Sequence, residues 1–281
     1  MILTILHPGE MGISVAAAAI SSGHRVLWVS EGRSEDTKSR ASFQKLEDIK
    51  TLSKISESEM VFSICPPQSA TEVARAVSET GFEGLYMDAN AGSPEKKHLI
   101  NDLLKASNID FVDGGIIGPP ANSEGSTRLY VSGERCDEIK DIFTDGFLSV
   151  HSVGHEIGKA ASLKIAYGAW TKGSSALILA VRAMAKNAGV EKDLLHEWGL
   201  SQPNAEAMTL LSATLNSPKA WRFVSEMNEI SETFASNGVP HVFWDAAAEV
   251  YERLTDFKNL PNDRVDIDSV LQKLIEPNED I

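Results

Sequence analysis

A short glycine-containing turn near the N-terminus has residue types suited to binding phosphate. The strand-like run "ILTIL" meets "HPGEMG", and a helix-like stretch, "ISVAAAAIS", follows. In dinucleotide-binding folds, glycines at this junction allow the tight turn, the approach of the pyrophosphate and close helix packing. Gly9 and Gly12 stand at the second and third of these positions, and His7 stands at the first. The alternative is a strand-to-helix turn without a ligand. We expect a pyrophosphate-binding turn made by His7, Pro8, Gly9, Glu10 and Met11.

The end of the second predicted strand, "RVLWV", is where such a fold reads the 2′ position of the cofactor. An acidic residue there binds a ribose hydroxyl, whereas an arginine suits a 2′-phosphate. Ser30 stands at the position of the acid, and Arg33 and Ser34 supply a guanidinium fork and a hydroxyl. Glu31 suits a ribose hydroxyl and opposes a phosphate. The segment favours NADP over NAD, with a solvated loop as the alternative.

A lysine inside an apolar helical run is a candidate for proton transfer. Lys164 lies in "SLKIAYGAW", where desolvation would lower its pKa and let it exchange a proton near neutral pH. The alternative is a lysine that extends its ammonium group to water at a domain boundary. Tyr167 lies three residues on, on the same helix face. It could bind substrate, donate the proton itself, or simply pack under the first domain.

The elements that would hold these residues change character along the chain. Up to about residue 154, short apolar runs alternate with helix-like segments, which predicts βαβ units and a parallel sheet covered on both faces. The remainder shows only helical periodicity, beginning with a long segment after Gly154. We therefore expect a Rossmann-type α/β domain at residues 1–154 and an all-α domain at residues 155–281.

Composition narrows the function classes. A net charge of −14 disfavours a nucleic-acid partner, although local arginines can still hold a cofactor phosphate. We expect no membrane span and no secretory leader, because long apolar runs and a basic N-terminal region are lacking. The two cysteines are expected as free thiols of a cytoplasmic protein. The histidines show no ligand spacing, so no metal is expected.

Several stretches together resemble the β-hydroxyacid dehydrogenase family, which is related to 6-phosphogluconate dehydrogenase. "HPGEMG" resembles the family's G-x-G-x-M-G turn, and "SICPPQSA" and "DANAGSP" resemble loops at the ends of later strands, the first of which borders the nicotinamide. "GHEIGKAASLKIAYG" resembles G-x-x-G-x-G-x-x-x-K-x-x-N, which implies that Lys164 is the catalytic lysine. The resemblance implies an NAD(P) cofactor, with Cys65, Pro66 and Asn90 among its contacts.

The same comparison shows departures at the substrate side. "DGGIIGPP" stands where the family has D-A-P-V-S-G-G, so Ile117 replaces a serine, and Tyr167 replaces an asparagine. Glu226 and Met227 replace a distal Lys-Asp pair. The pattern is closer to a branch of the family that carries a "DGGIIGPP" loop and a helical C-terminal domain. The implied substrate-binding residues are Gly115, Ile116, Ile117, Gly118, Glu226 and Trp244.

Two of these residues, Glu226 and Trp244, have alternative interpretations. Glu226 makes a pocket suited to a cation such as an amine or iminium, or it pairs with Lys164 or Arg222. Trp244 lines the pocket or belongs to the core. Backbone amides of the "DGGIIGPP" loop could hold a substrate oxygen, and its Asp113 is expected to be structural.

The sequence therefore predicts an NADP-dependent oxidoreductase, with NAD possible, that transfers hydride between nicotinamide and a small hydroxy/oxo compound. Lys164 and Tyr167 are the expected catalytic residues, with Lys164 as general acid/base and the active site between the domains. As in the family, the helical domain is expected to form a homodimer. The alternatives are an imine reductase, favoured by Glu226 and Tyr167 but opposed by Lys164, and a non-catalytic NADP-binding protein.

Overall fold

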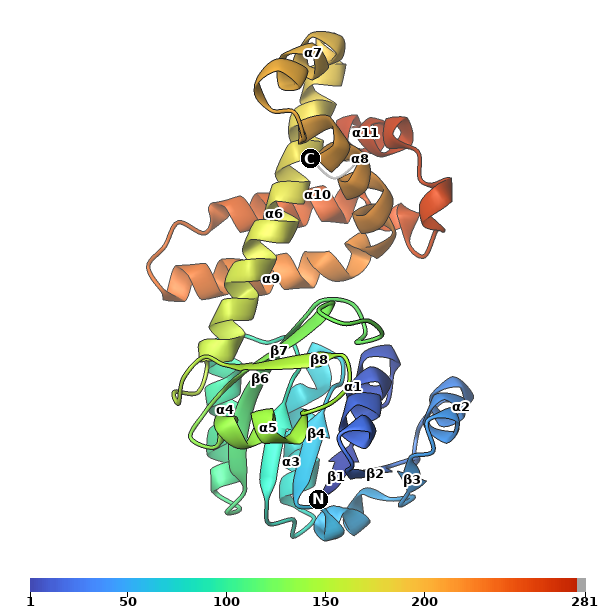
Figure 1. The fold of residues 1–281 in the computed structure, drawn as a ribbon. Helices are drawn as coiled ribbons and strands as arrows, with labels where there is room; N and C mark the ends of the chain where they lie inside the picture. The colour runs from blue at the N-terminus through green and yellow to red at the C-terminus, as the bar shows by residue number, and fades with distance from the viewer. Residues whose placement is uncertain (277–281) are drawn as a thin grey trace. The chain divides into compact units, whose positions relative to one another are not determined.

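The computed structural model describes residues 1–276, which divide into two compact units, Met1–Lys164 and a second unit that begins at Ile165 (Figure 1). The division falls inside one long helix, α6 (Lys159–Asn187), so that helix contributes to both units. The domain bounds expected from the sequence, 1–154 and 155–281, stay a prediction.

The first unit is built on a sheet of eight strands in the order β3-β2-β1-β4-β5-β6-β7-β8. The order of the first six is that of a Rossmann-type nucleotide-binding sheet. Adjacent strands from β3 to β6 are parallel. The strands are β1 (Ile2–Ile5), β2 (Arg25–Trp28), β3 (Glu47–Asp48), β4 (Met60–Ser63), β5 (Leu85–Asp88), β6 (Asp110–Ile117), β7 (Thr127–Ser132) and β8 (Leu148–Ser152).

One pairing differs from the parallel sheet that the sequence predicts. β6 and β7 run antiparallel, with Asp113 opposite Ser132 and Ile117 opposite Arg128, while β7 and β8 are parallel. A parallel neighbour needs a crossover of roughly a dozen residues or more, usually a helix, whereas an antiparallel neighbour needs only a short connection. The segment 118–126 between β6 and β7 holds no helix, so the chain reverses there.

Helices cover both faces of the sheet. Successive strand residues point to opposite faces, and in β5 Leu85 and Met87 lie in one buried cluster while Tyr86 lies in another. Burial on both faces explains why the strands read as continuous apolar runs. The helices of this unit are α1 (Glu10–Ser21), α2 (Glu35–Phe43), α3 (Ala70–Ser78), α4 (Pro94–Lys105) and α5 (Cys136–Ile142), with short 3₁₀ turns η1 (Leu52–Glu57) and η2 (Pro67–Ser69).

The second unit is helical throughout its described residues. Its core gathers Ile165, Leu179, Phe223, Met227 and Tyr251. None of the described helices is long and apolar enough to span a membrane. Beyond α6, the helices are α7 (Glu191–Ser201), α8 (Ala205–Asn216), α9 (Ala220–Ser236), α10 (Val242–Arg253) and α11 (Ile267–Ile275), with 3₁₀ turns η3 (Ser217–Lys219), η4 (Thr255–Phe257) and η5 (Asn262–Arg264). The predicted fold class, a Rossmann-type parallel-sheet domain followed by an all-α domain, is confirmed.

Candidate active site

The glycine-containing turn joins β1 to α1 as the sequence predicts. Gly9 is the N-cap residue of α1, and the space where its side chain would lie is open. A Cβ added to Gly12 would come within 2.2 Å of the backbone oxygen of His7. Gly12 therefore permits the close packing of helix against turn, and Gly9 leaves the first amides of α1 accessible for an anion.

His7 and Arg33 lie close enough to interact at this turn. His7 Nδ1 and Arg33 Nε are both buried without a hydrogen-bond partner among the described residues. Burial, and then the charge of Arg33, lowers the pKa of His7 to about 4, so the imidazole is neutral at pH 7. Burial also lowers the pKa of Arg33. Two unsatisfied polar groups beside an accessible helix N-terminus fit a phosphate-bearing ligand.

The predicted 2′ site lies at the ends of β2 and β3. Ser34 is the N-cap residue of α2, and its hydroxyl oxygen accepts a hydrogen bond from Thr37 N at 3.3 Å. Ser30 hydrogen-bonds with Asp48, a carboxylate that the sequence did not single out. Asp48 in turn pairs with Lys50 at 2.7 Å. Charges of both signs thus stand near the position that distinguishes a ribose hydroxyl from a phosphate.

The loops after β4 and β5 are fastened to each other by Asn90. Its side-chain oxygen accepts from Cys65 N at 2.5 Å, and its side-chain nitrogen donates to Ser63 Oγ at 3.2 Å. Burial raises the pKa of the Cys65 thiol. Pro66 is exposed and is the N-cap residue of the η2 turn. Asn90 is thus a brace that shapes the Cys65–Pro66 loop, and both ends of its amide are already bonded.

Lys164 is half-buried on α6 beside the predicted substrate loop. A Cβ added to Gly115 would lie 3.0 Å from Ala160 O and 3.3 Å from Lys164 Cβ. Glycine at this position therefore lets the first turns of α6 approach β6. Tyr167 follows on the same helix and is 47% exposed.

The remaining loop residues are less open than expected. Ile116 and Ile117 are buried within β6, and both pair with β7. Gly118 is exposed, with a φ of +121° that favours glycine. Asp113 is fully buried and hydrogen-bonded, in agreement with a structural role.

Glu226 has a partner, but neither of the two that the sequence suggested. It forms an ion pair with Lys172 of α6, whose ammonium group lies 5.0 Å from the centre of the Phe223 ring. Because its charge is already compensated, Glu226 is less available to a cationic substrate. Met227, its neighbour on α9, is fully buried in the core.

Trp244 packs into the second unit. Its ring covers Gly173, where an added Cβ would come within 2.2 Å of the indole, and it meets Phe234 edge-on at 4.9 Å. It also lines an apolar groove with Trp170, Leu177 and Phe243. Trp244 thus packs against the core of the second unit, as one of its two interpretations expects, and it also borders a surface groove.

The cysteines are free thiols, as expected. Cys136, Asp137 and His155 bring one potential ligand atom each within 4.8 Å of one another, although they have no recognisable spacing in sequence. Only Cys136 is buried, and its Sγ already lies 3.1 Å from Ser152 Oγ. The expectation of no metal stays a prediction.

Sequence reasoning missed a buried lysine near the candidate site. Lys97 of α4 is 1% exposed and lies between Asp88, the last residue of β5, and Asp113, the neighbour of Asp88 in β6. Burial alone would lower the pKa of Lys97, but the two carboxylates outweigh it and raise that pKa. A signal was present, since Lys97, Ile100 and Leu104 follow helical spacing on the buried face of α4.

Comparison with known proteins places the chain among structures of one fold. The protein-family model described as a domain of unknown function, DUF1932, matches residues 185–254. An uncharacterized 28.5 kDa protein from the 7S RNA 5′ region of Methanothermus fervidus is 32% identical over 170 residues, which are 59% of this chain and 63% of that protein. The match thus spans less than two thirds of that relative.

Solved structures extend the likeness over almost the whole chain. A conserved protein described as structurally similar to 3-hydroxyacid dehydrogenases is 24% identical, with a TM-score of 0.75 over 92% of this chain and 98% of that one. The 3-hydroxyisobutyrate dehydrogenase of Mycobacterium tuberculosis is 14% identical, with a TM-score of 0.68 over 97% of this chain and 98% of that one. The reductive aminase of Aspergillus terreus was solved in complex with NADPH and ethyl levulinate. It is 18% identical, with a TM-score of 0.58 over 96% of this chain and 98% of that one. The chain thus has the fold of the 3-hydroxyacid dehydrogenases, and the resemblance noted in its sequence is confirmed at that level.

Proposed function

We propose that this protein is an NAD(P)-dependent oxidoreductase that reduces, or in reverse oxidises, a small hydroxy/oxo compound. The observation that carries the proposal is the pair of buried, unsatisfied nitrogens of His7 and Arg33 beside the accessible N-terminus of α1. A scaffold without a ligand has no need of such groups, since burying a polar atom without a partner is costly.

The residues present fit a dinucleotide. The turn from His7 to Met11 would hold the pyrophosphate through backbone amides, and Arg33 would neutralise a phosphate with its unoccupied Nε. Cys65 and Pro66 would border the nicotinamide, with Asn90 fixing their loop. When bound, the nicotinamide supplies or accepts the hydride.

Lys164 would supply the proton that hydride chemistry requires. A C=O carbon that gains hydride leaves a developing alkoxide, which must be protonated, and an ammonium group can do this. Gly115 lets the first turns of α6 lie against β6, so Lys164 stands beside the "DGGIIGPP" loop that would receive the substrate. Tyr167, one turn further along α6, would bind the substrate or assist proton transfer.

NADP is the favoured cofactor. Arg33 lies near the predicted 2′ position, and its Nε is buried without a hydrogen-bond partner among the described residues, so it suits a phosphate. Asp48 at the end of β3 would favour a ribose hydroxyl. Its charge is compensated by Lys50, and it also forms a hydrogen bond with Ser30. NAD is therefore expected to bind more weakly.

Imine reduction is the second candidate. The reductive aminase that shares this fold was solved with NADPH, and an apolar Ile117 in the substrate loop suits a substrate without a carboxylate. Against it, the carboxylate of Glu226, which would attract an iminium, is already paired with Lys172. A hydroxy/oxo compound is therefore preferred.

Calorimetric titration with NADPH and NADH tests the cofactor site. Wild type is expected to bind NADPH at micromolar concentration, and Arg33→Ala is expected to weaken NADPH binding by about 1–3 kcal/mol with little change for NADH. Arg75→Ala on α3 is a matched control in the same unit. Binding of neither nucleotide would overturn the proposal.

Turnover tests the chemistry. NADPH oxidation with a panel of aldehydes, ketones, 2-oxo acids and cyclic imines is followed at 340 nm. We expect Lys164→Met to lower kcat by roughly 10²–10⁴-fold, the usual contribution of a general acid, while NADPH affinity is retained. NADPH that binds and is never oxidised with any substrate would favour the non-catalytic alternative.

A further inference from the structure

Lys97 is surrounded by polar groups from the end of β5, the residue Asn90 that follows it, and the middle of β6. Its Nζ lies 3.3 Å from Asp88 Oδ1 and 3.4 Å from Asp113 Oδ1. It also donates to the backbone oxygens of Asp88 at 2.9 Å and Asn90 at 3.1 Å, and it lies 3.5 Å from Gly114 O. One ammonium group therefore joins the carboxyl end of β5 to the middle of β6.

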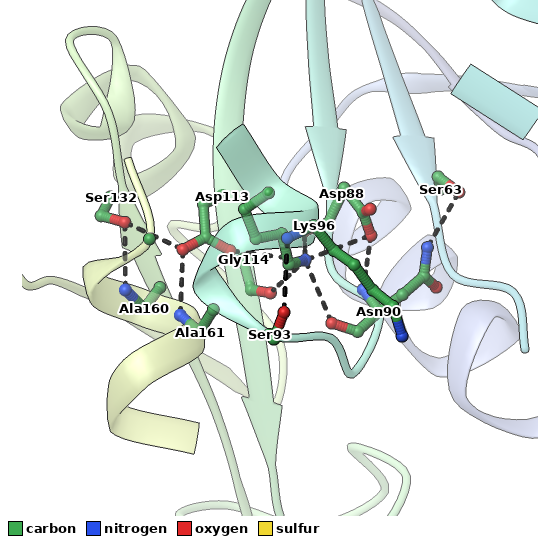
Figure 2. Close-up of polar contacts among 12 residues, drawn as sticks. Ser63, Asp88, Asn90, Ser93, Lys96, Asp113, Gly114, Ser132, Ala160 and Ala161 are labelled. Carbon is green, nitrogen blue, oxygen red and sulfur yellow. Dashed lines mark hydrogen bonds and ion pairs between the residues drawn. The ribbon is translucent and has the colours of Figure 1, made fainter. Parts of the chain in front are cut away.

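On one side, this cluster reaches the helix that carries Lys164. Asp113 Oδ2 accepts from Ala161 N at 2.9 Å and from Ser132 Oγ at 3.2 Å, and Ser132 Oγ accepts from Ala160 N at 3.0 Å (Figure 2). Two first-turn amides of α6 are thus capped by side chains from the sheet. A carboxylate at a helix N-terminus is favourable, because it meets unsatisfied amides and the positive end of the helix dipole.

On the other side, the cluster reaches the loop that would border the nicotinamide. Asn90 N donates to Asp88 Oδ1 at 2.8 Å, and the Asn90 side chain bonds with Cys65 N and Ser63 Oγ. Figure 2 shows a row made of two bonded groups, Ser63–Asn90–Asp88 and Asp113–Ser132–Ala160. Lys97 stands at the centre of that row.

Stability alone gives a poor reason for this arrangement. Desolvating charges is expensive, and an apolar group of similar volume often stabilises a protein as well as a buried ion pair does. A buried ion pair can instead fix one relative position of the elements that it joins.

We propose that Lys97 is a positioning residue that fixes the first turn of α6, and hence Lys164, relative to the Cys65–Pro66 loop that Asn90 braces. The proposal rests on the proposed function for its catalytic consequence. Its structural consequence, an ordered first turn of α6, does not depend on that function.

The test removes the central ammonium group together with one of its two carboxylates, so the net charge of the cluster does not change. Lys97→Met is combined with Asp88→Asn, and Asp113 is kept because its Oδ2 accepts from the Ala161 amide that the experiment follows. Lys105→Met, which replaces an exposed lysine on the same helix, is the matched control. Ser132→Ala removes only the last bonds of the row and serves if the double variant does not fold.

The first readout is amide hydrogen exchange at Ala160 and Ala161 in the full chain. The double variant and Ser132→Ala are expected to exchange these amides roughly tenfold faster or more, while amides of the sheet core keep their protection. Lys105→Met should leave both unchanged. Unchanged exchange at both amides in a folded variant would overturn the proposal, whether or not the protein is an enzyme.

The second readout separates positioning from general weakening. With a substrate found in the turnover panel, kcat should fall roughly tenfold or more, because misplacing a reacting group is costly, while KM and NADPH affinity change less than about threefold. Retained kcat together with faster exchange would overturn the catalytic consequence. If wild type shows no turnover, the proposed function fails, and the exchange readout alone decides the role of Lys97.

Discussion

At the scale of single residues, His7 is the unusual feature of the candidate cofactor site. It takes the place where the resemblance has a glycine, and its imidazole is enclosed near the cationic Arg33. Protonating His7 would bury a second positive charge beside the first. The neutral state is therefore the one compatible with the folded turn, and this has a consequence for stability.

Folding stability should fall with acidification through the titration of His7. Its pKa in the folded protein is about 4, against 6.5 for an ordinary histidine, so the unfolded chain binds the proton first as the pH falls. The contribution of neutral His7 to folding stability is fully present above pH 6.5, and about 3 kcal/mol of it is lost as the pH falls to 4. His7→Asn should flatten the dependence of the urea midpoint on pH in this window. His196→Asn, at an exposed position on α7, should leave it as in wild type. An unaltered slope in His7→Asn would contradict the assignment.

At the scale of elements, the β1–α1 unit depends on how closely the helix approaches its own turn. Gly12→Ala would place a methyl group 2.2 Å from the backbone oxygen of His7, so the helix must shift. We expect a loss of about 1–3 kcal/mol in stability, typical of overpacking, and a clear loss of NADPH affinity because the α1 amides move. Urea unfolding and calorimetry measure the two effects.

Gly199→Ala is the matched control for that change. Gly199 lies within α7, where an added Cβ meets nothing within 4 Å. Alanine is the better helix former, so stability should rise by about 0.5–1 kcal/mol and NADPH binding should not change. A Gly12→Ala variant as stable as wild type would show that the turn can relax without cost.

Elements with long periodic patterns were predictable, and short or context-dependent ones were not. The strands of the Rossmann sheet and helices such as α9 follow from periodicity and turn residues alone. The two-residue β3 and the seven-residue α5 are too short to give a periodic signal. β7 runs antiparallel to β6 because the segment that connects them holds no crossover helix, and the apolar pattern of β7 itself carries no sign of strand direction.

In the candidate site, residues that the backbone conformation requires could be predicted, whereas contacts between side chains of distant elements could not. Gly9 and Gly12 could be assigned from their positions, because each fulfils a requirement of the turn. The partner of Glu226 could not, since Lys172 lies on another helix far away in sequence. Lys97 was passed over because a charged residue is usually exposed, and the carboxylates of Asp88 and Asp113, which make its burial possible, lie on two other elements.

At the scale of the whole molecule, we propose that the helical unit pairs with a second copy of the chain. An apolar groove on α6 and α10 is lined by Trp170, Leu177 and Phe243, which are 72%, 62% and 72% exposed. Met184, also exposed, continues the row, because residues 170, 177 and 184 repeat at two helical turns. Contiguous exposed apolar side chains of this kind are typical of an interface.

A charge in this groove should therefore change the assembly state and leave the fold intact. Wild type is expected at twice the chain mass of 30.5 kDa in sedimentation equilibrium. Leu177→Glu should give the single-chain mass, because an unpaired carboxylate in an apolar interface is costly, while its far-UV circular dichroism stays unchanged since the residue is exposed. Lys192→Glu, an exposed site on α7 outside the groove, makes the same kind of change without touching the apolar row and should retain the double mass. A single-chain mass for wild type, or a double mass for Leu177→Glu, would rule out pairing through this groove.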